Sequence, residues 1–167
     1  MDFPKFQRLV EERTGFRTME NPTASGEYFS DSCGDMYNFF LKVGPGAVIE
    51  DISYFTTGCG FGTATCSLVV DLAKGKTVEE AAAITTGDVE VQLGGYPEKK
   101  KDYPERALEA LHVALDDYRD KVSAGSVPDY GKMPRSENGA APVPEPAPKT
   151  DENARPDADG KLLIKLR

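Results

Sequence analysis

Residues 36–55 read MYNFFLKVGPGAVIEDISYF, and apolar residues alternate with more polar ones on both sides of the GPGA break. Alternation with a period of two is typical of strands that bury one face, and a Gly- and Pro-rich break between two such runs is typical of a hairpin. The stretch therefore predicts two antiparallel strands. We expect a third strand around residues 27–29, where EYF precedes the hairpin.

Helical patterns lie on both sides of this hairpin. Residues 3–14 carry apolar side chains at helical spacing up to Gly15, and residues 61–74 are again helical, followed by Gly75, which suits the positive φ of a helix end. Thr77 and Glu80 form a capping box that predicts another helix start. The two glycines Gly94 and Gly95 end a further short helix predicted over residues 87–93.

The last helix is expected to begin with a second capping box, formed by Asp102 and Glu105. Its apolar face comprises Leu108, Leu111, Leu115, Tyr118 and Val122. Strands first and helices afterwards predict an α+β fold, in which helices pack on one face of a three-stranded antiparallel sheet.

The composition changes after residue 123. Seven of the 12 prolines lie in residues 124–167, together with Gly, Ala, Ser and charges of both signs. Such a segment buries too little apolar surface to offset the entropy lost on ordering. We therefore expect one folded domain at residues 1–123 and a Pro-rich disordered tail at residues 124–167. The tail ends in the short apolar motif GKLLIKLR, which could add as a strand to a partner's sheet or could simply fray.

The charge balance and the cysteine count exclude several classes of protein. Lys and Arg total 20 against 28 Asp and Glu, a net charge of −8 that disfavours binding to nucleic acid. The chain opens without a basic segment followed by an apolar one, and its apolar runs are short, so we expect no signal peptide and no membrane contact. Three cysteines do not suit a disulfide framework, and a cytoplasmic location is expected.

Two cysteines flank the predicted hairpin. Cys33 and Asp35 place a soft and a hard metal ligand around Gly34, just before the first strand of the hairpin. Cys59 lies between the second strand and the next helix, where free N–H groups and the helix dipole lower a thiol's pKa. Because a hairpin brings its outer ends together, the two thiols could share a metal ion. The alternative is that both are ordinary turn cysteines.

Cys66 and His112 are weaker candidates. Cys66 follows Cys59 by two helical turns, roughly 10 Å along the axis. It is interpreted as a small buried helix residue, although a binuclear cluster or a sulfur relay could use it. His112 is the only histidine, and it is interpreted as a boundary residue of the last helix. Cys–His pairs and Ser–His–Asp triads are therefore disfavoured, because each needs a histidine base.

Six motifs occur in order along the chain: ENPTASG (20–26), SCGD (32–35), VIEDISYFTTGCG (48–60), LVVDLAKGKTVEEAAAI (68–84), DVEVQLGGYPE (88–98) and a closing helix with DDY (116–118). Together they resemble the NifU/IscU-type iron–sulfur cluster assembly scaffolds, from about residue 21 to residue 121. The resemblance implies a SufE/NifU-like fold, a three-stranded antiparallel sheet with helices on one side. This agrees with the fold predicted from periodicity.

The resemblance also implies a ligand set for iron. Cys33, Asp35 and Cys59 match three family ligands. The family's third ligand cysteine usually follows a His at the start of the last helix, and this pair falls on Asp102 and Tyr103. The third thiolate is therefore absent.

Several groups could complete the set in its place. Asp102 ranks first because it lies where the family carries a ligand, and Tyr103 could bind as a phenolate. Cys66, a second protomer in a homodimer or an external thiol could also supply the missing ligand. Lys100 matches a lysine of the family site.

The function implied is that of a scaffold and not of an enzyme. Such a scaffold binds iron and a transient [2Fe–2S] cluster, or zinc in some members, takes sulfur from a cysteine desulfurase and passes the cluster to apo iron–sulfur proteins. A carboxylate ligand suits this role because it binds iron less strongly than a thiolate. Two different functions stay open: a zinc-bound sulfur acceptor for a desulfurase, and a degenerate paralogue that regulates a true scaffold.

Overall fold

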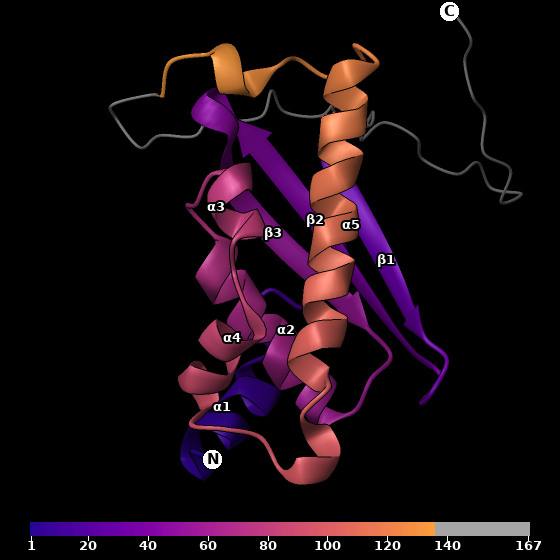
Figure 1. The fold of residues 1–167 in the computed structure, drawn as a ribbon, viewed down its shortest axis with the longest axis vertical. Coiled ribbons are helices and arrows are strands. Elements are labelled where there is room, and N and C mark those ends of the chain that lie inside the picture. Colours follow the sequence, from indigo (N-terminus) through magenta and orange to yellow (C-terminus); the bar gives the residue numbers. More distant parts are fainter. Residues whose placement is uncertain (136–167) are drawn as a thin grey trace, which may run out of the picture.

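The computed structural model describes residues 1–135 and, in that range, forms one sheet with helices packed against it (Figure 1). The strands are β1 (Ala24–Ser30), β2 (Asp35–Gly44) and β3 (Val48–Thr56). The α-helices are α1 (Phe3–Glu12), α2 (Gly60–Ala73), α3 (Val78–Ala82), α4 (Thr86–Leu93) and α5 (Tyr103–Ser123). Short 3₁₀ helices are η1 (Pro45–Ala47), η2 (Glu98–Lys100) and η3 (Tyr130–Lys132).

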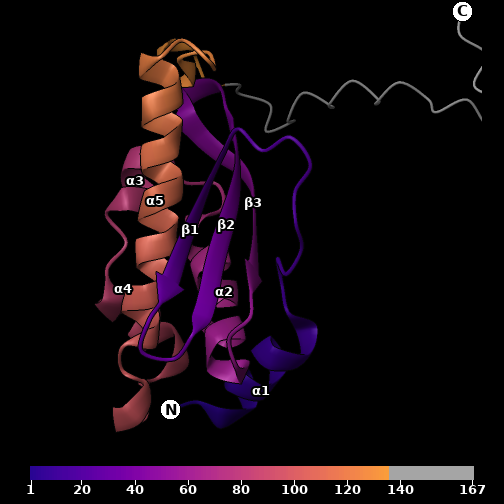
Figure 2. The same ribbon diagram turned by 90° about the vertical axis from the view of Figure 1, so that its right-hand side faces the viewer.

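The sheet has the order β1-β2-β3, and both strand pairs are antiparallel. Alternate residues of β2 are buried beneath the helices, namely Tyr37, Phe39, Leu41 and Val43. The helix α5 packs on β1 and β2, while α2 packs on β3. Figure 2 shows α3, α4 and α5 together on one side of the sheet. The predicted α+β fold, with a three-stranded antiparallel sheet, is confirmed.

The helix α5 lies directly against β1 at Gly26. A Cβ atom at this position would lie 2.1 Å from the backbone nitrogen of Ala114 and 2.7 Å from the carbonyl oxygen of Ala110. Only glycine therefore fits between the strand and the helix. The N–H of Ser25 also donates to the carboxylate of Asp117 in α5, at 3.0 Å. These contacts fix the position of α5 relative to the loop that follows β1.

The helix ends between α2 and α5 agree with the sequence in three places. Gly75 and Gly94 have φ of +81° and +69°, and Thr77 and Glu80 form the predicted capping box at the start of α3. None of the helices in residues 1–135 has the length and apolar character needed to span a bilayer.

The capping box predicted at the start of α5 is wrong. The N-cap residue Asp102 has φ −86° and ψ −7°, which is helical and not extended, and its side chain makes no capping hydrogen bond. Its carboxylate instead pairs with Arg106, one turn further along the helix. This ion pair brings a cation to the end of the sheet where Cys33 lies.

Residues 124–135, which we expected to be disordered, pack against the domain. The side chains of Val127 and Tyr130 contact the hydrophobic core, and the N–H of Gly46 donates to the carbonyl of Met133 at 2.9 Å. This part of the chain is ordered because it has two apolar side chains to bury. The rest of the predicted tail, residues 136–167 with the GKLLIKLR motif, lies outside the described residues.

Candidate functional site

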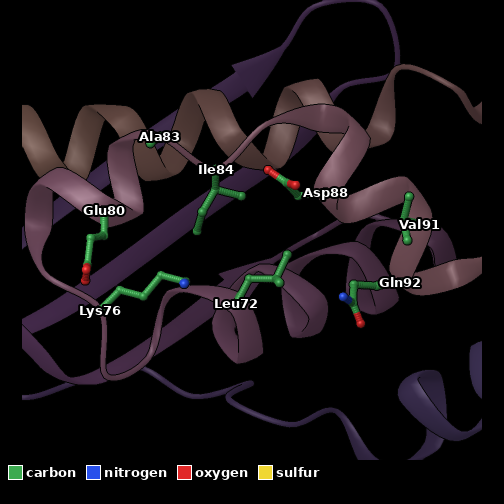
Figure 3. Close-up of a pocket in the computed structure, with 8 residues that line it drawn as sticks. All are labelled: Leu72, Lys76, Glu80, Ala83, Ile84, Asp88, Val91 and Gln92. Atoms are coloured by element: carbon green, nitrogen blue, oxygen red, sulfur yellow. The ribbon is translucent and has the colours of Figure 1, made fainter.

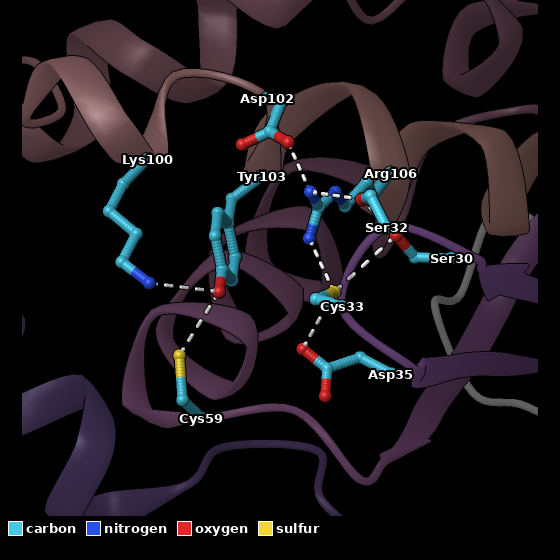
Figure 4. A network of polar contacts seen from close by, with 9 residues as sticks. All are labelled: Ser30, Ser32, Cys33, Asp35, Cys59, Lys100, Asp102, Tyr103 and Arg106. Atoms are coloured by element: carbon cyan, nitrogen blue, oxygen red, sulfur yellow. Dashed lines mark hydrogen bonds and ion pairs between the residues drawn. The ribbon is translucent and has the colours of Figure 1, made fainter.

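The outer ends of the β2–β3 hairpin meet at one end of the sheet. The N–H of Met36 donates to Thr57 Oγ1 at 3.0 Å, and the N–H of Thr57 donates to the carbonyl of Met36 at 3.2 Å. Cys33 comes just before β2 and Cys59 just after β3, so both exposed thiols lie at this end, next to the first turn of α5 (Figure 4). The hairpin thus brings the two thiols to the same end, as the topology predicts.

The thiol of Cys33 has three polar neighbours. It donates to Asp35 Oδ2 at 3.2 Å and lies 3.4 Å from Ser30 Oγ. The guanidinium of Arg106 donates to the Cys33 sulfur through Nη1, at 2.7 Å. A soft and a hard metal ligand therefore lie side by side, and a cation contacts the soft one.

Arg106 is held on several sides. Its Nη2 donates to Ser32 Oγ at 3.0 Å and pairs with the carboxylate of Asp102. Its guanidinium carbon lies 5.0 Å from the centroid of the Tyr103 ring, within cation–π distance. Only 11% of the Arg106 side chain is exposed, so this charge has little contact with water and a fixed position.

Cys59 is held by a different set of groups. Its sulfur lies 3.3 Å from the hydroxyl of Tyr103, which in turn accepts a hydrogen bond from Lys100 Nζ at 3.2 Å. The Lys100 ammonium also lies 4.9 Å from the centroid of the Tyr103 ring, and the ring of Phe61 lies 6.0 Å from that of Tyr103, centroid to centroid. Tyr103 is therefore placed between the two cations Lys100 and Arg106.

The surroundings of Cys59 favour its thiolate. Partial burial opposes ionisation, but the Tyr103 hydroxyl, the N–H groups of Gly62 and Phe61 and the charge of Lys100 together lower the pKa of the Cys59 thiol. Cys59 is the N-cap residue of α2, where the helix dipole also favours negative charge. The structure thus agrees with the expectation that this thiol ionises readily.

The Tyr103 hydroxyl stays protonated at neutral pH and is therefore able to donate a hydrogen bond. Burial raises the pKa of the Tyr103 hydroxyl, and its hydrogen bond with Cys59 raises it further, against the opposing effect of Lys100. A protonated hydroxyl can donate to a Cys59 thiolate while it accepts from the Lys100 ammonium. The three groups therefore form a short chain of hydrogen bonds that ends on sulfur.

Cys66 and His112 lie apart from these contacts. Cys66 is fully buried within α2, and burial raises the pKa of its thiol strongly. This agrees with its interpretation as a buried helix residue. His112 lies on α5 and is partly buried, as expected of a boundary residue.

Apart from Cys66, the site residues named from the sequence lie, together with four further residues, in two adjacent clusters. The Cys33 cluster comprises Ser30, Ser32, Cys33, Asp35, Asp102 and Arg106, and the Cys59 cluster comprises Cys59, Phe61, Lys100 and Tyr103. Within residues 1–135, no three thiol, carboxylate or imidazole groups converge closely enough to hold a metal ion. The side chains of Cys33, Asp35 and Cys59 must therefore reorient before they could bind one ion.

The residue that sequence reasoning missed is Arg106. It lies four residues after Asp102 and three after Tyr103, so on a helix it shares a face with both. That spacing was visible in the sequence. Its contact with Cys33, 73 residues earlier, was not, because it depends on how α5 packs against β1.

A hollow on the surface, away from the two clusters, differs from them in the side chains that line it. It lies between α2 and the α3–α4 segment, with Leu72 and Ile84 inside and Lys76, Glu80 and Asp88 among the residues that line it (Figure 3). It contains no cysteine, and both acidic groups are engaged in capping boxes. The chemistry of the described residues is therefore concentrated at the Cys33 and Cys59 clusters.

Comparison with known sequences assigns these motifs to a family. The model of the NifU-like N terminal domain matches residues 10–124, which include all of both clusters. The chain belongs to the NifU-like N-terminal domain family. It is 37% identical to the iron–sulfur cluster assembly scaffold protein IscU of Aquifex aeolicus over 117 residues, which cover 70% of this chain and 73% of that protein.

Other members of the NifU-like family are similarly related. IscU 1 of Archaeoglobus fulgidus is 38% identical over 115 residues, covering 69% of each chain. IscU of Escherichia coli K12 is 34% identical over 109 residues, covering 65% of this chain and 84% of that protein. These matches confirm the family resemblance drawn from the six motifs.

Solved structures support the same fold. The N-terminal part of a NifU-like protein from Brucella abortus superimposes with a TM-score of 0.52 at 17% identity, covering 72% of this chain and 99% of that one. A protein of Fervidobacterium islandicum AW-1, described as a proposed iron–sulfur cluster assembly scaffold for the SUF system, gives a TM-score of 0.54 at 19% identity. The match covers 66% of this chain and 93% of that one. At these identities the comparison supports the NifU-like fold alone.

Proposed function

We propose that this protein is an iron–sulfur cluster assembly scaffold, which builds a transient [2Fe–2S] cluster on Cys33, Asp35 and Cys59. The observation that carries the proposal is the pair of exposed thiols at one end of the sheet, each beside a cation or a hydrogen-bond donor. Soft thiolates bind iron strongly, and membership of the NifU-like family supports an iron–sulfur cluster as the group that these thiolates bind.

The fourth ligand comes from the start of α5. Asp102 is the first candidate because its carboxylate is 48% exposed and joins the Cys33 cluster through Arg106. Tyr103 is the second candidate, since its hydroxyl lies 3.3 Å from the Cys59 sulfur. Cys66 is disfavoured by its complete burial in α2. An oxygen ligand in this position holds iron less firmly than a thiolate, which suits a cluster that must leave.

The partners follow from this chemistry. The sulfur would come from a cysteine desulfurase as a persulfide, which an electron donor would reduce to sulfide, and the cluster would go to apo iron–sulfur proteins. The IscU proteins of Aquifex aeolicus and Escherichia coli carry the name of scaffold, which supports the same role here. In this role the protein binds and transfers its cargo without catalytic turnover of its own.

Anaerobic reconstitution tests the proposal. The full chain is incubated with ferrous iron, cysteine, a cysteine desulfurase and dithiothreitol as the reductant, and iron, acid-labile sulfide and the visible spectrum are then measured. We expect about two irons and two sulfides per cluster, with a charge-transfer chromophore. Cys33→Ala and Cys59→Ala should lose the chromophore, whereas Cys66→Ala, the matched control, should keep it.

Two results would overturn the proposal. One is a wild-type protein that takes up zinc but never a cluster, which would support the zinc-bound sulfur acceptor. The other is a chromophore that survives both Cys33→Ala and Cys59→Ala, which would show that these two cysteines are not the ligands.

Transfer of the cluster is tested separately. When the reconstituted protein is mixed with an apo [2Fe–2S] ferredoxin, the scaffold should lose its chromophore to the ferredoxin.

A further inference from the structure

The position of Arg106 is not explained by cluster binding. Its guanidinium donates to Cys33 at 2.7 Å and pairs with Asp102, so it bridges two of the groups proposed as ligands. Both groups would have to turn toward an incoming metal ion, and in this arrangement both are turned toward a cation. Arg106 thus competes with the metal for the same sulfur and oxygen atoms.

The fixed position of Arg106 makes this competition effective. The guanidinium also donates to Ser32 Oγ at 3.0 Å and lies over the Tyr103 ring, and only 11% of the side chain is exposed. A partly buried positive charge is less screened by water than a fully exposed one, so it repels a second cation more strongly than a surface charge would.

The Cys59 cluster has no equivalent obstacle. Its cation, Lys100, contacts the hydroxyl of Tyr103, and within residues 1–135 the sulfur of Cys59 contacts that hydroxyl and no cation directly. Tyr103 therefore separates charge from thiol on this side, whereas on the other side the charge touches the thiol. The barrier to metal binding is concentrated at Cys33.

We propose that Arg106 is a latch: it holds Cys33 and Asp102 away from the metal, and the site assembles only when this guanidinium is displaced. The proposal rests on the scaffold function proposed above. Arg106 is a positioning residue in this account, and its role is to weaken the resting affinity of the site for metal. It also makes Cys59 and Asp35 the groups that meet the metal first, with Cys33 joining after the latch opens.

Zinc titration of the full chain tests the latch. Zn²⁺ is used as the probe in competition with a chromophoric chelator, on the wild type and on Arg106→Gln, which keeps N–H donors but removes the charge. We expect Arg106→Gln to bind zinc about tenfold more tightly, because one adjacent positive charge is lost. Arg106→Lys keeps the charge without the forked geometry and should lie between the two. Circular dichroism and thermal unfolding of the metal-free proteins establish that each variant folds.

Two controls separate the latch from a general effect of charge or folding. Arg119→Gln removes an arginine from the same helix, where it pairs with Glu79 and Asp116 on the surface, and should leave zinc affinity unchanged. The gain from Arg106→Gln should also be smaller in a Cys33→Ala background, where the latch has lost its sulfur partner.

The outcomes distinguish the latch from the function it depends on. If the wild type builds a cluster but Arg106→Gln binds zinc equally or less tightly, the scaffold stands and the latch is wrong. A gain of the same size in the Cys33→Ala background would also overturn the latch. If neither protein binds zinc or builds a cluster, the proposed site is wrong and the latch falls with it.

Discussion

The Cys33 and Cys59 clusters lie at the same end of the sheet, but different levels of structure hold them. Cys59 is the N-cap of α2, and its environment comes from the backbone of that helix, from Lys100 at the end of η2 and from Tyr103 at the start of α5. Cys33 is contacted by Arg106 from a helix that begins 70 residues later. The Cys59 thiol is therefore tuned in part by the backbone of the helix that follows it, whereas the charge beside the Cys33 thiol comes from the packing of α5 on β1.

The largest expected effect concerns that packing. Gly26→Ala would place a Cβ atom 2.1 Å from the backbone of α5, so we expect a loss of at least about 2 kcal/mol in the free energy of unfolding. The matched change Gly87→Ala, inside α4 where the new Cβ meets only Thr85 Oγ1 at 3.7 Å, should be neutral or stabilise by up to about 1 kcal/mol. Urea denaturation of both variants measures the difference. Equal stabilities would show that α5 does not rest on β1 as described.

The buried thiol of Cys66 provides a reference for the two exposed ones. Burial raises its folded-state pKa above the unfolded value near 8.5, so the stability it contributes is complete below that pH and is lost as the pH rises through the folded-state pKa. Above a pH of about 9, the wild type should lose about 1.4 kcal/mol per pH unit through this thiol, and Cys66→Ala should not. Urea denaturation between pH 7 and 10.5 under reducing conditions compares the two slopes. Parallel curves would contradict the burial of Cys66.

The environment of Cys59 is tested by Tyr103→Phe, which keeps the aromatic ring and removes the hydroxyl. Loss of this hydrogen bond should raise the pKa of Cys59 and slow its alkylation by iodoacetamide at pH 7 severalfold. Cys33 in the same molecule is the internal control and should react at its wild-type rate. Mass spectrometry of the two peptides gives both rates, and an equal change at both thiols would show that the clusters are not independent.

The smallest effect is expected from Asp102→Asn. The ion pair of Asp102 with Arg106 has one partner that is half exposed, so its removal should cost less than about 1 kcal/mol of stability. Asp116→Asn, which breaks the pair with Arg119 on the same helix, is the control. Thermal unfolding compares them, and a much larger loss for Asp102→Asn would mean that this pair organises the whole start of α5.

Much of the fold was predictable because it depends on local patterns. The alternation over residues 36–55 predicts β2 and β3. Gly75 and Gly94 predict helix ends through a positive φ that few other residues adopt, and Thr77 predicts a helix start through its capping hydrogen bond. The capping box at Asp102 failed because a nearby arginine offered the carboxylate a better partner than the backbone N–H groups. The order in residues 124–135 was missed because composition alone does not reveal which few apolar side chains find a surface to cover.

In the candidate site, the placement of the two thiols at one end of the sheet was predictable, but the cation beside Cys33 was not. Cys33, Asp35 and Cys59 were named from residue type, from their positions around a hairpin and from the family resemblance. Arg106 was missed, although its spacing from Asp102 is local.

The sequence by itself determined the order of strands and helices, the exposed turn positions of Cys33 and Cys59 and the membership of the NifU-like family. These properties follow from neighbours along the chain, since periodicity, turn residues and motifs are local. The tertiary structure alone decided that Arg106 contacts Cys33, because Gly26 lets α5 lie directly on β1 and so brings a partly buried charge to a thiol 73 residues away. Close packing is a property of distant segments in three dimensions, and no local pattern specifies it.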